Sequence, residues 1–387
     1  MTTDKHNKRP NVPPLRFPEF TDEWEQHMTT DFFEFKNGLN PDVKRFGTGI
    51  KFISVMDILN NRYITYDKII SAVEAKDDDL RDFGVNYGDI LFQRSSETLE
   101  DVGRANVYLD EKPALFGGFV IRGKRIGDYN PLFFRYLLSS PSVRKRIIVK
   151  GAGAQHFNIG QDGLSKVSLF VPSAKEQDRI AQLLNAIDKR IEVQSGLIED
   201  LQKLKAALYQ KVFSSIPGEE VALSNLAKII KGKQINGTEL FDSGNYYVMN
   251  GGTLPSGFYN EYNTPANTIS ISEGGNSCGY VQFNNVPFWS GGHCYTLQIT
   301  SKQIHLSYLY HYLKHREQVI MALRIGSGLP NIQKKDLERF PILMPTIEIQ
   351  QKLSRIFDSL QRKEEVEKSI LNRCLSQKQY LLQKMFI

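Results

Sequence analysis

The sequence lacks the features of several large classes of protein. Its three cysteines, Cys278, Cys294 and Cys374, lie far apart, without the CxxC spacing of zinc sites or an even disulfide framework. The most apolar stretch, 132–138, is interrupted by Arg135, so a membrane span is excluded. The N-terminal residues MTTDKHNKRPNVPP have no apolar core, so we expect no secretory signal, and the cytoplasm is the predicted compartment.

The chain is also short of strong charge of either sign. It has 49 Lys and Arg residues against 43 Asp and Glu residues, a net charge of +6. This charge permits a polyanionic partner such as nucleic acid but does not require one. Hydrophobic residues make up 41% and charged residues 24%, which is typical of globular protein, and 387 residues predict two or three domains.

An internal repeat organises the chain. Residues 158–213 and 331–386 align without a gap, and most non-identical pairs match apolar with apolar residues. Upstream the repeat is looser, with 90–96 facing 269–276 and 132–137 facing 308–313. The identical pairs are Asn158/Asn331, Ile159/Ile332, Leu164/Leu337, Pro172/Pro345, Gln177/Gln350, Glu192/Glu365, Val193/Val366, Lys205/Lys378, Leu208/Leu381, Gln210/Gln383, Lys211/Lys384 and Phe213/Phe386.

Each copy of the repeat predicts one long helix. Proline followed by Ser173 or Thr346 offers an N-cap, and apolar residues then recur in alternating steps of four and three. Each helix would run for about 40 residues, or roughly 60 Å. We expect the two helices to pair with each other, because one chain tethers them. Polar residues at seam positions, Glu364 and Glu367, mark either the register or a face for another protein's helices.

The predicted fold class is α+β, with two mixed α/β blocks separated by the two long helices and related by a pseudo-two-fold repeat. The blocks are rich in short strand-like runs and in turns such as Asn236-Gly237. The four predicted segments are 1–172, 173–214, 215–345 and 346–387.

Two stretches resemble type I restriction-modification specificity subunits of Gram-positive bacteria. Pro14 to Trp24 (PLRFPEFTDEW) is similar to the usual opening of those proteins. Residues 151–180, with Gly-x-Gly, Asn-Ile, Leu, Pro and Glu-Gln-x-x-Ile, resemble the family's junction into its first helix. Residues 326–353 repeat this junction, except that Ile349 replaces the glutamate. The resemblance covers essentially the whole chain.

The resemblance implies a DNA reader without catalytic residues or a cofactor of its own. Two target-recognition domains would each read half of a bipartite, asymmetric site in double-stranded DNA, and an antiparallel coiled coil would set the spacing. Two modification subunits would methylate adenine with S-adenosylmethionine, and restriction subunits would use ATP and Mg²⁺ to translocate and cleave DNA.

An enzyme acting on DNA, a nuclease or methyltransferase, is the alternative function. The Walker A pattern is absent, and Asn285-Val-Pro-Phe288 departs from the methyltransferase motif Asn-Pro-Pro-Phe, so we interpret it as a turn. Glu74-Ala-Lys76 with Asp57 or Asp67, and the run Asp77 to Asp79, imitate metal sites, but a solvated acidic loop is the simpler interpretation. A third alternative is a coiled-coil scaffold that reads no DNA.

Residues suited to DNA lie in loops of both blocks. Loops 93–96 and 273–276 are the candidates for base contacts, and basic residues near the Gly151-x-Gly153 and Gly326-x-Gly328 loops are the candidates for phosphate contacts. Structural turns, solvated charges and, for His156, a structural histidine are the alternatives, and no metal ligand is predicted. The predicted DNA-binding residues are Lys36, Asn37, Gln93, Arg94, Ser95, Ser96, Arg144, Lys145, Arg146, Lys150, Gln155, His156, Lys231, Lys233, Glu273, Gly274, Gly275, Asn276, Trp289, His293, Arg316 and Arg324.

Overall fold

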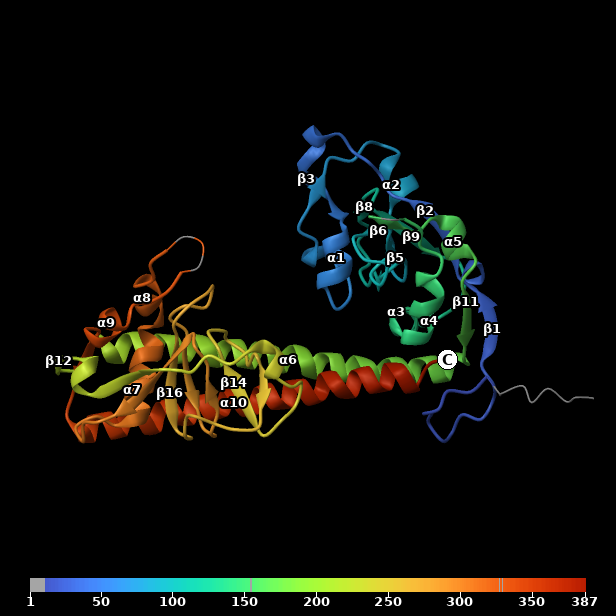
Figure 1. Cartoon of the computed structure of the whole chain (residues 1–387). Helices are drawn as coiled ribbons and strands as arrows, with labels where there is room; N and C mark the ends of the chain where they lie inside the picture. The colour runs from blue at the N-terminus through green and yellow to red at the C-terminus, as the bar shows by residue number, and fades with distance from the viewer. Residues whose placement is uncertain (1–10, 154, 327, 329) are drawn as a thin grey trace, which may run out of the picture. The chain divides into compact units, whose positions relative to one another are not determined.

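A computed structural model describes residues 11–153, 155–326, 328 and 330–387 (Figure 1). Most of the N-terminal segment examined for a secretory signal, and the middle of the predicted 326–328 loop, therefore lie outside the described residues. The chain forms two compact units, unit 1 (Met1–Ser195 with Ile370–Ile387) and unit 2 (Gly196–Ser369). Their boundaries fall within the long helices, so these units differ from the four predicted segments, which remain a prediction.

Two long helices are present where the repeat predicts them. Helix α6 (Ala174–Phe213) and helix α10 (Ile347–Lys384) are each continuous. Within unit 2 they run antiparallel, because Lys205 contacts Gln361 while Tyr209, one turn further along α6, contacts Phe357, one turn earlier on α10. Every described residue of the predicted apolar seams is buried or half-buried, which confirms the pairing face. No helix in the described part of the chain is long and apolar enough to cross a membrane.

Glu364 sets the register of the helix pair in unit 2. Its carboxylate accepts hydrogen bonds from Lys205 at 2.5 Å, Lys368 at 2.7 Å and Gln202 at 2.9 Å. Burial alone would raise the pKa of Glu364, but these hydrogen bonds outweigh it and lower the pKa to about 2. Of the two roles left open by the sequence for this seam residue, the structure supports register.

The two blocks share the strand order of their larger sheets, while the two-stranded sheet β10-β6 of unit 1 is matched in unit 2 only by a single bridge between Gly274 and Asn331. The four-stranded sheets run β2-β9-β5-β7 in unit 1 and β13-β19-β16-β17 in unit 2, and the three-stranded sheets run β4-β3-β8 and β15-β14-β18. Two-stranded sheets β1-β11 and β12-β20 precede the long helices. The duplication therefore extends over the blocks in which sequence identity is low.

Each of the remaining strands and helices belongs to one of the two units. In unit 1 they are β1 (Glu25–Met28), β2 (Phe33–Asn37), β3 (Phe46–Ile53), α1 (Val55–Asn60), β4 (Ala72–Val73), α2 (Asp79–Phe83), β5 (Ile90–Gln93), β6 (Ser95–Ser96), β7 (Ala105–Val107), β8 (Leu115–Phe116), β9 (Val120–Arg125), α3 (Pro131–Ser139), α4 (Pro141–Ile148), β10 (Phe157–Asn158), α5 (Gln161–Ser165) and β11 (Ser168–Val171). In unit 2 they are β12 (Glu219–Ala222), β13 (Ala227–Lys231), β14 (Tyr246–Met249), β15 (Gly257–Tyr259), β16 (Thr268–Ser272), β17 (Val281–Asn284), β18 (Trp289–Ser290), β19 (Cys294–Ile299), α7 (Leu306–His315), α8 (Glu317–Ala322), α9 (Lys334–Glu338) and β20 (Pro341–Met344).

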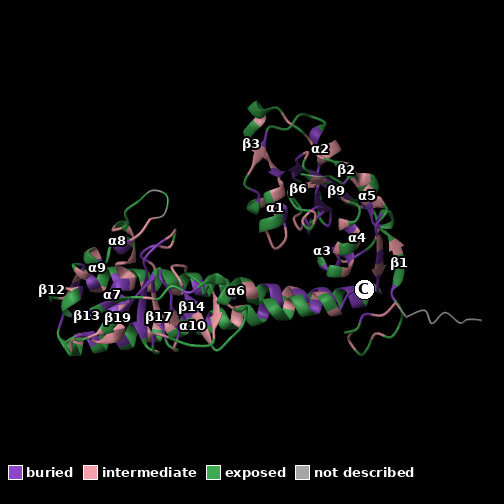
Figure 2. Ribbon diagram, in the orientation of Figure 1, coloured by how far each residue is buried: buried purple, intermediate pink, exposed green. Residues whose placement is uncertain are grey.

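The core of each block is completed by both long helices. In unit 1, Leu184 near the start of α6 and Phe386 just after α10 pack with Trp24 and other buried residues. In unit 2, Phe213 at the end of α6 and Phe357 near the start of α10 have the corresponding places. Figure 2 shows this alternation of buried and exposed residues along the helices. The identical pair Phe213/Phe386 is thus explained by equivalent packing in the two units.

The identical glutamines Gln177 and Gln350 attach each block to its long helix. The side-chain oxygen of each accepts a hydrogen bond from the backbone N–H of the residue just before α3 or α7, at 3.0 and 2.8 Å. The side-chain amide of each donates to the carbonyl of the proline five residues earlier, at 3.0 and 2.9 Å. A glutamine has the donor and the acceptor that this double contact needs.

Candidate nucleic-acid interface

In unit 1 the predicted reading loop is fixed by its backbone. The N–H of Arg94 donates to the carbonyl of Phe119 at 2.9 Å, and the Arg94 carbonyl accepts from the N–H of Ile159 at 3.0 Å. One guanidinium nitrogen of Arg94 also donates to the carbonyl of Gly118 at 3.3 Å. Arg94 is half-buried, and the adjacent Phe119 ring is 69% exposed. This loop holds a cationic and an aromatic side chain next to each other.

The corresponding loop of unit 2 has the same backbone contacts. The N–H of Glu273 donates to the carbonyl of His293 at 2.9 Å, and the Glu273 carbonyl accepts from the N–H of Ile332 at 2.9 Å. Because Ile332 is the repeat partner of Ile159, positions 94 and 273 are structurally equivalent, and so are positions 119 and 293. The sequence alignment of 90–96 with 269–276 has this same register.

Glycines pack tightly behind both loops. The N–H of Gly38 donates to the carbonyl of Val120 at 3.2 Å, and Gly232 donates in the same way to Cys294 at 2.9 Å. A Cβ atom would lie 2.0 Å from a carbonyl oxygen at Gly38 and 2.2 Å from one at Gly232, so no larger residue fits either position without a shift of the backbone. The carbonyls concerned belong to the pairs Gly117-Gly118 and Gly291-Gly292.

Each block therefore presents three equivalent side chains, here called the tip positions. They are Asn37, Arg94 and Phe119 in unit 1 and Lys231, Glu273 and His293 in unit 2. Sequence reasoning identified five of these six residues and missed Phe119. The repeated signal Gly-Gly-x-Val/Cys before strands β9 and β19 would have found it.

The tip positions of unit 2 form an ionic cluster. The Glu273 side chain is about nine-tenths buried, and its Oε1 accepts hydrogen bonds from Lys231 Nζ at 2.5 Å and Tyr295 Oη at 3.3 Å. His293 Nδ1 lies 3.7 Å from Oε2, and Oε2 accepts no hydrogen bond within the described part of the chain. Burial, aided by the neighbouring Glu273 charge, raises the pKa of Tyr295 to about 12. The Tyr295 hydroxyl thus stays a hydrogen-bond donor at neutral pH.

Two of the predicted phosphate contacts, Arg144 and Arg146, donate to backbone carbonyls. Arg144 donates to the carbonyls of Glu100 and Val102 at 2.8 and 2.7 Å, and burial lowers its pKa to about 10. Arg146 donates to the carbonyl of Ser168 at 3.2 Å, and burial lowers its pKa as well. Both guanidinium groups therefore attach α4 to its surroundings, a role that the sequence did not indicate.

The remaining candidates of unit 1 differ in exposure. Gln93 is buried and donates to the carbonyl of Ser95 at 2.8 Å, a geometry that does not favour a base contact. The ammonium group of Lys36 lies 4.7 Å from the centre of a phenylalanine ring. Gly153 has φ +145 and its Cβ would clash with the carbonyl of His156, which favours the turn interpretation of the 151–153 loop. Lys145, Lys150, Gln155 and His156 are exposed, and Ser95 and Ser96 are half-buried.

In unit 2 the candidates outside the ionic cluster differ in exposure and in their partners. The indole N–H of Trp289 donates to the carbonyl of Lys233 at 3.0 Å, so the ring is held in place. Gly275 has φ +78 with open space around its Cα, whereas Gly274 is buried. Lys233, Asn276 and Arg324 are exposed, and Arg316 is half-buried.

Two of the carboxylates considered for a metal site, Asp57 and Asp79, have structural roles. Asp57 accepts from the backbone N–H of Ser54 at 2.7 Å and caps α1. Asp79 accepts from Arg45 and from the backbone N–H of Lys76. Over the described ranges, no group of three or more His, Cys, Asp or Glu side chains is placed to hold a metal ion.

Comparisons with known proteins agree on one family. The family model of the type I restriction modification DNA specificity domain matches residues 21–203 and 217–374, one match in each half of the repeat. A Mycoplasma pneumoniae protein named as a type I specificity subunit is 36% identical over 141 residues. That match covers 35% of this chain, and the chain spans 37% of the length of that relative.

Solved structures share the fold over nearly the whole chain. The S subunit of a type I restriction-modification system from Mycoplasma genitalium has a TM-score of 0.70 at 21% identity and covers 97% of this chain and 99% of its own. A chain from a structure titled for complex assembly and conformational transition of the type I system has a TM-score of 0.54 at 15% identity, covering 95% and 98%. The duplicated strand order and these comparisons lead to one conclusion: the chain belongs to the type I restriction-modification DNA specificity family, and it is a specificity subunit.

Proposed function

We propose that the chain reads a bipartite, asymmetric sequence in double-stranded DNA, one half-site with each unit. The observation that carries this proposal is the pair of equivalent loops that present different side chains at the tip positions on the same backbone. Equivalent geometry suits two readings of one kind of groove, and different side chains suit two different base sequences.

The chemistry is assigned to partner subunits. Two modification subunits would methylate adenine with S-adenosylmethionine, and restriction subunits would use ATP and Mg²⁺, all in the cytoplasm where the DNA lies. The identical dipeptides Glu192-Val193 and Glu365-Val366 support two equal docking sites, since Val193 is 72% and Val366 55% exposed. Core packing therefore does not account for their identity in the two copies.

The experiment is to map methylated adenines in a methylation-free host that expresses this chain with its modification partner. We expect one motif with two defined parts separated by a gap. Replacing residues 1–172 by those of another family member should change one part and leave the other. A scaffold that reads no DNA would leave both parts unchanged. Methylated or cleaved DNA from the purified chain alone, given S-adenosylmethionine, ATP and Mg²⁺, would overturn the proposal.

The docking sites have a separate test. Val193→Asp and Val366→Asp place a charge on each proposed site, and each should reduce the number of modification subunits in the purified complex from two to one. The mass of the complex measures this number. Val286→Asp, at an exposed valine outside the long helices, is the control and should retain two. Retention of two subunits by both helix variants would contradict the docking assignment.

A further inference from the structure

Positions 94 and 273 are equivalent in backbone but opposite in hydrogen-bonding chemistry. The Arg94 guanidinium can only donate hydrogen bonds, and an ionised Glu273 carboxylate can only accept them. The two loops are held by the same pair of backbone hydrogen bonds, so this inversion reflects the side chains and not a different loop shape.

One oxygen of the Glu273 carboxylate, Oε2, has no hydrogen-bond donor among the described residues. Lys231 donates to Oε1 at 2.5 Å and holds the group in place, and the Tyr295 hydroxyl shares its one proton between Oε1 at 3.3 Å and the Ile332 carbonyl at 3.2 Å. Oε2 is buried and accepts no hydrogen bond among the described residues, and its nearest polar neighbour, His293 Nδ1, lies 3.7 Å away. A buried acceptor of this kind is costly unless a ligand supplies a donor. Lys231 and His293, both more than half exposed, lie beside it at the surface.

The base edges of DNA differ in what they offer to such an acceptor. In the major groove, cytosine presents its N4 amino group as a donor without an adjacent acceptor of its own. Adenine presents its N6 amino group next to N7, an acceptor whose lone pair would face the second carboxylate oxygen. Guanine presents only the acceptors N7 and O6 on this edge, which match a guanidinium.

We propose that these equivalent positions read opposite base edges: Arg94 contacts guanine in the first half-site, and Glu273 contacts the N4 amino group of cytosine in the second. The assignment rests on the proposed function and specifies it, because it names the base at one position of each half-site. Lys231 and Tyr295 act as positioning residues that orient the Glu273 carboxylate.

The test uses the complex of the full chain with its modification partner and a library of DNA duplexes randomised over each half-site in turn. The unmodified complex should select cytosine at one position of the second half-site. Glu273→Gln keeps the size of the side chain and a hydrogen bond to Lys231, and should lower that preference about five-fold or more. The preference for adenine at the same position should increase, because a glutamine amide can form hydrogen bonds with adenine N6 and N7. The first half-site should not change.

Two matched variants complete the design. Glu220→Gln makes the same substitution at an exposed residue of β12, in a different sheet of unit 2, and should leave both half-sites unchanged. Arg94→Ala should weaken a guanine preference in the first half-site only. The melting temperature of each variant shows whether the unit still folds.

Several outcomes would overturn the assignment. If Glu273→Gln weakens binding to every sequence alike, the carboxylate orients Lys231 toward phosphate and reads no base. If the second half-site contains no G·C pair, the assignment of cytosine is wrong. In both cases a two-part site still supports the proposed function. Selection of no two-part site by the unmodified complex would instead refute the proposed function itself.

Discussion

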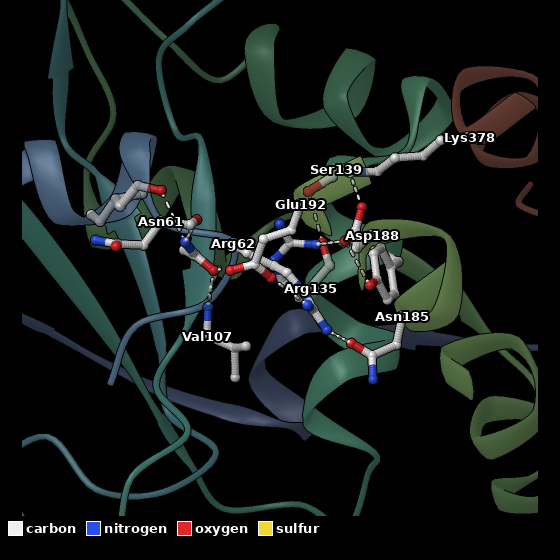
Figure 3. A network of polar contacts seen from close by, with 12 residues as sticks. Asn61, Arg62, Val107, Arg135, Ser139, Asn185, Asp188, Glu192 and Lys378 are labelled. Atoms are coloured by element: carbon white, nitrogen blue, oxygen red, sulfur yellow. Dashed lines mark hydrogen bonds and ion pairs between the residues drawn. The ribbon is translucent and has the colours of Figure 1, made fainter. Parts of the chain in front are cut away.

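In the two units, equivalent blocks attach to the long helices through different polar side chains. In unit 1 the centre of the attachment is Asp188 of α6, whose side chain is 5% exposed (Figure 3). It accepts from Lys378 of α10 at 2.7 Å, from the hydroxyl of Tyr136 at 2.8 Å and from Arg135 at 3.3 Å. Arg135 is the charge that interrupts the most apolar stretch of the sequence, and this buried ionic network accounts for it.

In unit 2 the position equivalent to Asp188 is Gln361, and the centre moves to a histidine. Lys205, the repeat partner of Lys378, donates to Gln361 at 2.8 Å. The fully buried His311 faces the hydroxyl of Tyr209 through Nδ1 at 2.8 Å and Asp358 through Nε2 at 2.9 Å. Aromatic rings fill the remaining space, with Phe213 stacked on His315 at 5.2 Å between ring centres.

The neighbouring surface differs as well. In unit 1 Arg62, next to strand β7, reaches α6 and pairs with Glu192 at 3.0 Å. In unit 2 the equivalent strand β17 borders an open cleft of about 880 Å³, lined also by Gln202 and Arg362 of the long helices. The duplicated backbone thus fixes where each block attaches, and the side chains that make the attachment have diverged. The stability of the two units should therefore respond differently to the same perturbations.

The largest expected effect comes from removing the centre of the ionic attachment. Asp188→Ala leaves Arg135 and Lys378 without their shared anion, and breaking a buried ion pair in this way costs about 3–5 kcal/mol. Gln361→Ala at the equivalent place removes two hydrogen bonds, one from Lys205 and an exposed one to Glu365, and should cost about 1–2 kcal/mol. Denaturant unfolding followed by fluorescence resolves the two units, because Trp24 lies in unit 1 and Trp289, the only other tryptophan, in unit 2. Equal losses from both variants would contradict the comparison.

A smaller effect should come from pH. Burial lowers the pKa of His311, although the hydrogen bond to Asp358 acts in the opposite direction, and burial also lowers the pKa of His315. On acidification the two histidines therefore become protonated at a higher pH in the unfolded chain than in the folded unit. Stability of unit 2 should be complete above about pH 6.5 and fall below it, by at most about 1.4 kcal/mol per pH unit for each histidine.

None of the attachment residues described for unit 1 is a histidine. Between pH 7 and pH 5 the free energy of unfolding of unit 2, followed by Trp289, should therefore fall faster than that of unit 1, followed by Trp24. His311→Asn should reduce the slope for unit 2. A slope that is equal in the two units, or that persists unchanged in the variant, would show that the buried histidine does not distinguish them.

The sequence predicted those parts of the molecule in which equivalent residues of the two copies make equivalent contacts. Gln177 and Gln350 remain identical because each makes the same contacts in its unit, and Phe213 and Phe386 because they pack equivalently. Lys205 and Lys378 reach equivalent helix positions, occupied by Gln361 and Asp188. The seams predicted the helices because a buried face must recur with the helical period. These features are local or periodic and can therefore be read from one chain.

The candidate site was only partly predictable for the opposite reason. The tip positions differ between the two copies, so no identity marks them, and Phe119 was missed. Arg144 has the composition of a surface charge, and only the folded structure places it against two backbone carbonyls. Backbone hydrogen bonds from distant segments decide which loop residue is presented, and a single sequence does not display such contacts.

The tight glycines behind the tip positions bear on how the proposed recognition could change. The backbone there admits no Cβ at Gly38 or Gly232, and the two loops keep the same backbone hydrogen bonds although their tip residues differ. If the tip positions read bases as proposed, new specificities can arise from a single replacement at one of them, without a change of the surrounding block. A replacement of either glycine should instead abolish recognition of every sequence by that half of the molecule.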